Sequence, residues 1–364
     1  MSQLEVNSID KYSGNNLSVG SQLNLKSYTT TNRDALTSVA GDMIYNETTN
    51  KVEYYTGSAW ASGLAAVQIQ FVIVAGGGGG AGIWGAANMA SSGAGAGGYV
   101  SNVTGENTGG GLSSTQTMYI APSTNYTVSI GAGGTGTQSQ NQESGYEGSP
   151  SYFNNITAEG GGAAQSYIEK MALGRSAKGG SGGGRGTYIN RAGISTEGGD
   201  GLTGQGYDGG SVQQVYNGAA NATGGGGGAS AVGANGSSNN GGNGGAGVAT
   251  SISGSSVTYA GGGGGAGSSS NGSGGAGGGA DAVSSTNGNS GTANTGGGAG
   301  GIYNGDSSDR YGGNGGSGIV VLRYPNTYTL SQSGLTTSNI NTAIGGTSDK
   351  YTTITAGTGT VSFA

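Results

Sequence analysis

The chain has 364 residues and a formal net charge of −6, with 88 glycines, 3 prolines, 20 tyrosines, no cysteine and no histidine. The missing cysteine and histidine exclude disulfides, thiol catalysis, thiolate zinc sites, Ser-His triads and histidine-ligated metals. The acidic balance disfavours nucleic acid and anionic membranes as partners. Only 8% of the residues are charged, and this favours an ordered protein, because disordered chains are typically highly charged and poor in aromatic residues.

No apolar run reaches the ~20 residues of a membrane-spanning helix. The first residues lack a signal peptide, so we expect a protein that is not secreted by the usual route.

Residues 1–66 have the pattern of ordinary β sequence. Apolar and polar residues alternate in LEVNSID, NLSVG and QLNLKS, and Gly and Asn separate these segments as they separate half-buried strands. The stretch GDMIYNETTNKVEYYTGSAW predicts a β-hairpin around the turn NETTN, with Met43, Tyr45, Val52 and Tyr54 alternating along its arms. We interpret this region as an attachment or shaft domain with no helix longer than two turns.

Residues 67–324 are rich in glycine and are punctuated by short strand-like segments. Val, Ile, Thr and Tyr dominate VQIQFVIVA, NYTVSIG, SVTYA and GIVVLRY. Within them, the runs FVIV and IVVL predict strands that are buried on both faces. Residues 325–364 are rich in Thr and Ser with alternating apolar positions, which predicts a short β tail.

The stretch AGGGGGAG occurs twice, at 75–82 and at 260–267. Such runs form either flexible linkers or polyglycine-II helices, which have about three residues per turn and no internal hydrogen bonds. Neighbouring helices of this kind can hydrogen-bond laterally if no side chain blocks the approach and if proline, which has no N–H, is absent. We therefore predict that the glycine runs form the core. The expected fold class is all-β plus polyglycine-II without substantial α-helix, in domains 1–66, 67–324 and 325–364.

The sequence holds no strong catalytic or metal motif. GxGxxG matches carry no information at this glycine content, and no G-K-[ST] stretch is present for a P-loop. Asp306 and Asp309 in NGDSSD are a weak candidate for a Ca²⁺ site, but an ordinary Asp/Ser turn explains the same residues. Solvated loop charges, rather than a carboxylate pair for glycoside cleavage, best explain the glutamates at 143, 147, 159 and 169. We expect no enzymatic activity and no cofactor.

Aromatic residues in the glycine-rich loops are the more informative candidates. Tyrosine among Ser, Gly and Asn is the composition of antibody-like contact loops, and sugar rings stack well on aromatic faces. The alternative is that these rings cap the bundle or pack between protomers. We expect Tyr188 and Tyr207 on an exposed end of the domain. The charged residues close to them in the sequence are Arg185, Arg191 and Asp208. The candidate receptor-binding residues are Trp84, Tyr167, Tyr188, Tyr207, Tyr216, Tyr303 and Tyr311.

The order of the elements is similar to that of a known family. The array QFVIVAGGGGGAG, GAGAGGYVSN, YTVSIGAGGTG, AEGGGAA, VTYAGGGGGAGS and GGSGIVVLRYP covers about 67–325. It resembles the glycine-rich domain of tail-fibre and other virion proteins of phages that infect marine bacteria. MSQLEVNSIDKYSG and GDMIYNETTNKVEYYTGSAW also resemble segments of phage structural proteins. The chain departs from fibre proteins in having no recognisable C-terminal chaperone or endopeptidase segment.

The resemblance implies a function in the virion. Glycine-rich adhesins of some long tail fibres are polyglycine-II sandwiches that display receptor-binding loops, and a related region of certain receptor tyrosine kinases combines strands with a polyglycine-II bundle. We therefore expect a non-enzymatic phage fibre or adhesin, located in the virion and made in the host cytoplasm. Its expected partners are further copies in a homotrimer, other virion proteins through the N-terminal region, and a host surface glycan or outer-membrane receptor, with no nucleic acid. The alternatives are a purely structural virion component, such as a capsid-decorating or neck fibre, and an ice-binding or extracellular surface protein.

Overall fold

The computed structural model describes residues 25–49, 51–62, 67–85, 87–114, 117–137, 144–166, 177–186, 197–212 and 222–364. The chain forms two compact units, residues 1–65 and 66–364, and each is described by itself. Almost all regular structure in these residues is β-strand, as the sequence predicts. No helix in the described part of the chain is long and apolar enough to cross a membrane.

The N-terminal unit contains a four-stranded sheet. Its elements are β1 (Ser27–Tyr28), α1 (Thr30–Asp34), β2 (Met43–Asn46), β3 (Lys51–Tyr55) and β4 (Trp60–Ser62), and the strand order is β1-β2-β3-β4. Strands β2 and β3 are antiparallel, with Met43 opposite Tyr54 and Tyr45 opposite Val52, which confirms the predicted hairpin. The segments LEVNSID and NLSVG lie outside the described residues.

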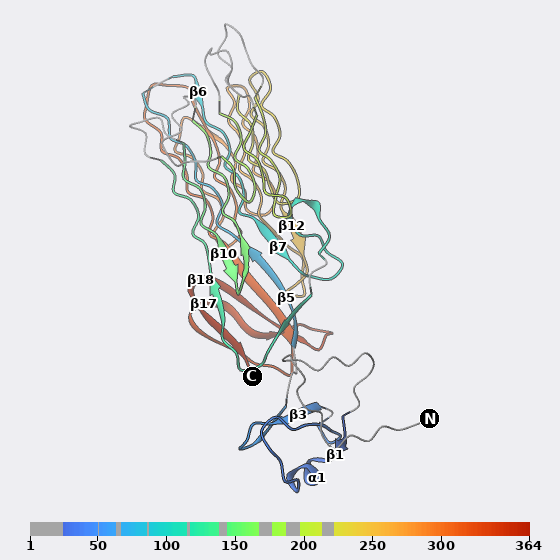
Figure 1. Cartoon of the computed structure of the whole chain (residues 1–364). Coiled ribbons are helices and arrows are strands. Elements are labelled where there is room, and N and C mark those ends of the chain that lie inside the picture. The colour runs from blue at the N-terminus through green and yellow to red at the C-terminus, as the bar shows by residue number, and fades with distance from the viewer. Residues whose placement is uncertain are drawn as a thin grey trace, which may run out of the picture. The chain divides into compact units, whose positions relative to one another are not determined.

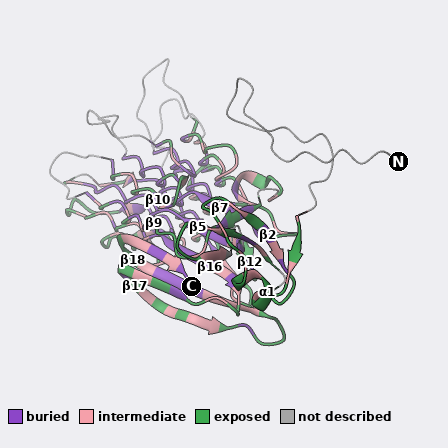
Figure 2. Cartoon of the chain, turned by 60° about the horizontal axis from the view of Figure 1, so that its bottom comes forward, coloured by how far each residue is buried: buried purple, intermediate pink, exposed green. Residues whose placement is uncertain are grey.

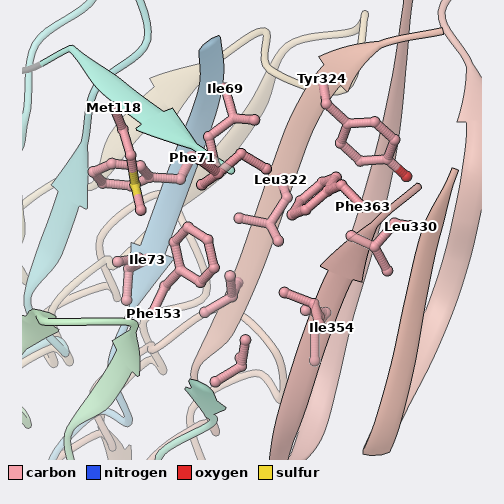
Figure 3. Packing of buried hydrophobic residues seen from close by; sticks show 14 of the residues in the cluster. Ile69, Phe71, Ile73, Met118, Phe153, Leu322, Tyr324, Leu330, Ile354 and Phe363 are labelled. Carbon is pink, nitrogen blue, oxygen red and sulfur yellow. The ribbon is translucent and has the colours of Figure 1, made fainter. Parts of the chain in front are cut away.

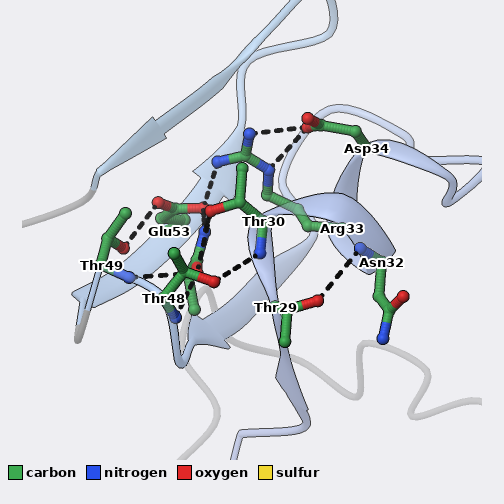
Figure 4. A network of polar contacts seen from close by, with 9 residues as sticks. Thr29, Thr30, Asn32, Arg33, Asp34, Thr48, Thr49 and Glu53 are labelled. Carbon is green, nitrogen blue, oxygen red and sulfur yellow. Dashed lines mark hydrogen bonds and ion pairs between the residues drawn. The ribbon is translucent and has the colours of Figure 1, made fainter.

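A buried polar network joins α1 to this hairpin (Figure 4). The carboxylate of Glu53, which is only 4% exposed, accepts a hydrogen bond from Arg33 Nη1 at 2.7 Å. It also accepts bonds from Asn46 Nδ2 at 2.9 Å and from Thr49 Oγ1 at 3.1 Å. Burial alone raises the pKa of Glu53, but the three donors outweigh burial, so the pKa lies below its usual value. The charged form of Glu53 is therefore the one that the fold stabilises.

The second unit is built on a nine-stranded sheet. Its strands are β5 (Val67–Val74), β7 (Tyr99–Ser101), β8 (Met118–Ile120), β9 (Tyr126–Ser129), β10 (Ser151–Phe153), β11 (Ile156–Ala158), β16 (Ile319–Pro325), β17 (Leu330–Ala343) and β18 (Asp349–Phe363). The order is β11-β10-β9-β18-β16-β5-β7, with β17 on the other edge of β18 and β8 beside the first half of β5. A 3-10 turn at Gly109–Gly111 follows β7.

Strands β5 and β16 lie at the centre of this sheet and are buried on both faces over residues 71–74 and 319–322. Residues 71–74 are completely buried, as the run FVIV predicts. Phe71 and Ile73 face the larger apolar cluster, in which Phe153 also packs (Figure 3). The alternate residues of both strands face a second cluster around Tyr99. The β17–β18 hairpin covers one face of these two strands, and the glycine-rich segments cover the other face. The two central strands therefore join the β-sheet to the glycine-rich segments in this unit.

Residues 325–364, which the sequence predicts to be a separate tail, are hydrogen-bonded into the same sheet. Strand β18 pairs with β17 on one edge, and with β16 and then β9 on the other. The sheet curls until it nearly closes into a barrel. Asn341 links the two ends of β17, because its Oδ1 accepts from Leu330 N at 2.7 Å and its Nδ2 donates to Leu330 O at 2.9 Å. The C-terminal hairpin thus belongs to the second compact unit.

The glycine-rich segments extend from the sheet as a bundle of chains that are not strands (Figure 1). Gly77 donates to Gly316 O at 2.9 Å, and three residues later Gly80 donates to Gly313 O at 2.8 Å. Between them, Gly78 donates to a different segment, at Gly95 O. Residues three positions apart therefore reach the same neighbour, whereas successive residues reach different neighbours.

Both AGGGGGAG runs are enclosed by hydrogen-bonded neighbours, and all their residues are buried. Much of the glycine-rich bundle around them is buried as well (Figure 2). The run 260–267 bonds to six segments, namely 91–96, 223–229, 242–245, 272–275, 277–280 and 295–301. The run 75–82 bonds to 95–98, 134–137, 146–149, 161–164, 299 and 313–316. The glycine runs are therefore core segments and not linkers.

Glycine is required here because neighbouring backbones approach too closely to admit a side chain. A Cβ on Gly263 would lie 1.9 Å from Ala299 O, and a Cβ on Gly76 would lie 2.0 Å from Ala132 O. In both cases the obstacle is backbone, which cannot swing aside as a flexible side chain can. A side chain in these runs would force whole segments apart.

Burial of an outer segment of the bundle repeats every three residues. Gly131, Gly134 and Thr137 are buried, whereas Ala132 and Thr135 are exposed. Every third residue of this segment therefore faces the bundle. The hydrogen bonds agree with this spacing, because Gly134 donates to Gly77 O and Thr137 donates to Gly80 O.

Asparagine side chains hold exposed edges of the bundle. Asn243 Oδ1 accepts from Ser273 N at 2.9 Å, while the next residue, Gly244, donates to Ser273 O at 2.8 Å. We call this pair of contacts the asparagine clamp. The same two contacts join Asn235-Gly236 to Ser211 and Asn287-Gly288 to Tyr311. Each clamp pairs a backbone N–H with a side-chain oxygen in place of a backbone carbonyl.

Short strands lie at both ends of the bundle. At the sheet end, β12 (Val248–Thr250) pairs with β13 (Val257–Tyr259). At the opposite end, β15 (Ile302–Asn304) pairs with β6 (Met89–Ala90) and β14 (Val283–Ser284).

Candidate functional site

The structure describes four of the seven candidate aromatic residues. Tyr167, Tyr188 and Tyr216 lie outside the described residues, as does Arg191. Trp84, Tyr303 and Tyr311 belong to segments at the end of the bundle remote from β17 and β18, around β6 (Figure 1). We call this end the tip and define it by residues 83–85, 87–90, 283–288 and 302–311. Tyr207 lies elsewhere, at the sheet end.

A backbone bridge at the tip brings Trp84 and Tyr311 onto neighbouring chains. Ile83 and Arg310 exchange two hydrogen bonds, at 2.9 and 2.8 Å, and each aromatic residue directly follows a bridged residue. Ile83 is completely buried, whereas Trp84 is half-buried and Tyr311 is 44% exposed. The clamp at Asn287 also fixes the backbone of Tyr311, with its N–H bonded at 3.0 Å and its carbonyl at 2.8 Å. Both aromatic residues therefore stand on a fixed backbone.

Tyr303 acts at least in part as scaffold. Its ring packs against the buried cluster of Ala90, Ala266 and Ala282, and its hydroxyl donates to Asn88 Oδ1 at 2.9 Å. These contacts agree with the alternative that some rings cap the bundle.

The two aspartates of the weak Ca²⁺ candidate accept hydrogen bonds from protein donors. Asp306 accepts from Ser308 N at 2.8 Å and forms an ion pair with Arg310 at 3.0 Å. The Ser308 bond, together with Arg310, holds the pKa of Asp306 below its usual value. Asp309 Oδ1 accepts from Gly85 N at 3.1 Å. Within the described ranges, no three His, Cys, Asp or Glu residues form a group that could hold a metal ion.

Of the two tyrosines expected on an exposed end of the domain, Tyr188 lies outside the described residues and Tyr207 lies at the sheet end. Tyr207 is half-buried, and its backbone bonds to Gly228 O at 3.1 Å and to Gly182 N at 3.0 Å. Arg185 is 6% exposed and donates from Nη1 to Gln165 Oε1 at 2.8 Å. An arginine in a sequence this poor in charge suggests a surface contact, but here its side chain is buried in the bundle.

The tip combines exposed aromatic area with side-chain carboxylates and amides. Flat rings provide stacking surface, and oxygen and amide groups provide hydrogen bonds, which is the chemistry of a site for polar ligands such as sugars. Segment 302–311 contains three charged side chains. Arg310 pairs with Asp306, and Asp309 adds a second negative charge, so the net charge of the segment is negative. This balance favours an uncharged ligand over an acidic one.

Residues 48–325 match the model of a family described as a glycine-rich domain. The matched segment starts in the turn between β2 and β3, spans the whole bundle and ends at Pro325, the last residue of β16. The β17–β18 hairpin lies beyond it. A search of curated proteins found no match.

Proposed function

Because the chain belongs to the glycine-rich domain family, we propose that it is a non-enzymatic fibre or adhesin of a phage virion that presents its tip to a host cell-surface glycan. The observation that carries this proposal is the placement of Trp84 and Tyr311 on a fixed backbone at the end of the bundle. The connection to phages rests on the sequence resemblance, and the family match supports its glycine-rich part.

The proposal assigns the glycine segments to polyglycine-II helices. These helices have ~3 residues per turn. The hydrogen-bonding partners along 76–80 and the burial along 131–137 both repeat every three residues, which supports the assignment. A segment bonded on all sides cannot move without breaking bonds to several others, so the bundle is stiff. A stiff platform loses little conformational entropy when its end binds a ligand.

The aromatic residues at the tip suit a glycan as ligand better than they suit a protein loop, which would need a pocket to bury it. A sugar ring needs one flat face and a few hydrogen-bonding groups, and the tip offers an exposed tyrosine and a half-buried tryptophan on neighbouring chains. Tyrosine supplies this area at low entropy cost because it has only two rotatable side-chain bonds.

The N-terminal unit is the proposed attachment region. Met43 and Tyr54 lie directly opposite each other on β2 and β3 and are 47% and 40% exposed. An exposed apolar pair on so small a sheet supports association with further copies in a homotrimer and with other virion proteins. The protein would be made in the host cytoplasm and located in the virion.

A double variant tests the tip. Trp84→Ala with Tyr311→Ala removes both rings, each of which is worth roughly 1 kcal/mol in a stacked contact, so affinity should fall about tenfold or more. The measurement is flow cytometry of labelled protein on marine bacterial cells, with an array of purified bacterial surface polysaccharides as the second readout.

The matched control is Tyr119→Ala, which removes a 60% exposed ring from β8 at the sheet end. It should bind cells as the parent does. If the double variant also binds as the parent does while remaining folded, the tip is not the receptor site, and a purely structural fibre becomes the better explanation.

A further inference from the structure

A hollow of about 400 Å³ lies at the sheet end of the bundle, beside Tyr207. The segment that follows β7 forms one wall, and the start of β12 forms another. Small-ligand sites are typically concave and have volumes of ~300–1,000 Å³. Its lining includes the polar side chains of Glu106, Asn107, Tyr207 and Ser230.

Tyr207 is held in a fixed position at this hollow. Its N–H and carbonyl are both bonded to neighbouring glycine segments. Its hydroxyl lies against Gly111, where a Cβ would be only 2.4 Å from the hydroxyl oxygen. Gly111 has φ +73°, a conformation that favours glycine, so the backbone there also excludes a side chain that would displace the ring. The aromatic wall is therefore preformed.

The polar wall has hydrogen-bonding capacity that the protein does not use. Glu106 Oε1 accepts from Ser251 N at 2.8 Å and from Ser251 Oγ at 2.7 Å. The other carboxylate oxygen, Oε2, is buried and accepts no hydrogen bond from the described part of the chain. Ser230 Oγ donates to Ala246 O at 3.1 Å, which leaves its oxygen able to accept. The Asn107 amide adds both a donor and an acceptor at the same wall.

We propose that this hollow binds one sugar unit of a neutral saccharide, with the ring stacked on Tyr207 and hydroxyl groups bonded to Glu106 and Asn107. Hydroxyl groups both donate and accept, so they satisfy the carboxylate and the amide together. Among the lining residues only Glu106 is charged, so an acidic ligand is repelled. A simple ammonium ion would pair with Glu106 but would leave the amide donor unused. The inference does not rest on the function proposed for the tip, because none of its residues belongs to the tip.

The test uses the intact protein and saturation-transfer NMR with the methyl glycosides of glucose, galactose, mannose and N-acetylglucosamine, followed by titration of the best binder. Tyr207→Ala and Glu106→Gln should each weaken binding about fivefold to tenfold, whereas Tyr207→Phe keeps the ring and should remain within about twofold of the parent. The tip double variant should bind the glycoside unchanged. Thermal unfolding of each variant reports whether the fold is kept.

Several results would overturn the proposal. They are the absence of saturation transfer to any of the four glycosides, full binding by folded Tyr207→Ala, and loss of binding in the tip double variant. Putrescine competing with the bound glycoside more strongly than a second glycoside does would overturn it in favour of a cation site. If Tyr207→Ala fails to fold, Glu106→Gln decides alone, because it keeps the shape of the side chain and an acceptor for Ser251.

Discussion

Replacement of Gly263 by alanine should unfold or strongly destabilise the bundle through a single methyl group. The added Cβ would lie 1.9 Å from Ala299 O, whereas ordinary contact begins at 3.4 Å, so the two backbones must separate by about 1.5 Å. Two hydrogen bonds join these two backbones on either side of the clash, because Gly298 N donates to Gly261 O at 3.0 Å and Gly301 N donates to Gly264 O at 2.9 Å. A shift of that size breaks both bonds. At roughly 1–3 kcal/mol for each buried group left unpaired, the two bonds give a loss of about 2–6 kcal/mol, a large part of the 5–15 kcal/mol that typically stabilises a domain.

The assay is urea unfolding followed by near-UV circular dichroism, with Gly345→Ala as the matched control. A Cβ on Gly345 meets nothing within 4 Å, and its φ is not in the left-handed region. The control should be neutral or slightly stabilising, because alanine reduces the entropy of the unfolded chain by about 0.4–1 kcal/mol. If the two variants differ by less than about 1 kcal/mol, the glycine runs tolerate side chains and the close-packing argument fails.

Three further predictions concern stability and association. Because the pKa of Glu53 is lowered in the folded state, Glu53 contributes to the free energy of unfolding above the pKa of an unfolded glutamate, and this contribution is lost as pH falls through the folded pKa. Trp60 fluorescence should report the resulting acid unfolding of the N-terminal unit. Glu53→Gln should make the stability of this unit less dependent on pH. Asn235→Ala combined with Asn243→Ala leaves two edge N–H groups unpaired and should raise the aggregation rate measured by turbidity, while an unchanged rate would mean that the clamps do not protect the edge. The proposed homotrimer should appear in light scattering as a multiple of the 34.7 kDa chain, and a single 34.7 kDa species at micromolar concentration would exclude it.

Sequence reasoning succeeded where the cause of a structure is local. Alternation around NETTN is enough to predict the β2–β3 hairpin, and the run FVIV is enough to predict a strand buried on both faces. It did not predict that β18 pairs with β17 on one edge and with β16 and then β9 on the other, because the Thr- and Ser-rich pattern of 349–363 fits many partners equally well. Pairing between such strands is decided by the whole core and not by either strand alone.

The candidate site shows the same division. No sequence rule places residue 83 beside residue 310, so Trp84 and Tyr311 could be identified as candidates but not as neighbours. The asparagine clamps had a readable signal, because all three are Asn-Gly dipeptides inside glycine-rich sequence. An Asn-Gly pair ordinarily indicates a turn, so the dipeptide alone does not distinguish a clamp from a turn. The burial of Arg185 had no signal in the sequence.

The bundle also has a consequence for how the protein folds. An α-helix forms its first hydrogen bonds within one turn, but the backbone hydrogen bonds of the two AGGGGGAG runs go to other segments, and Gly77 reaches Gly316 near the far end of the domain. The first run therefore cannot complete its hydrogen bonds until almost the whole domain has been synthesised, and chains dominated by such distant contacts fold slowly. The same connectivity slows the reverse process, because a central run cannot leave while its neighbours remain. The lifetime of the native protein would then be governed by the rate of unfolding, more than by the equilibrium free energy.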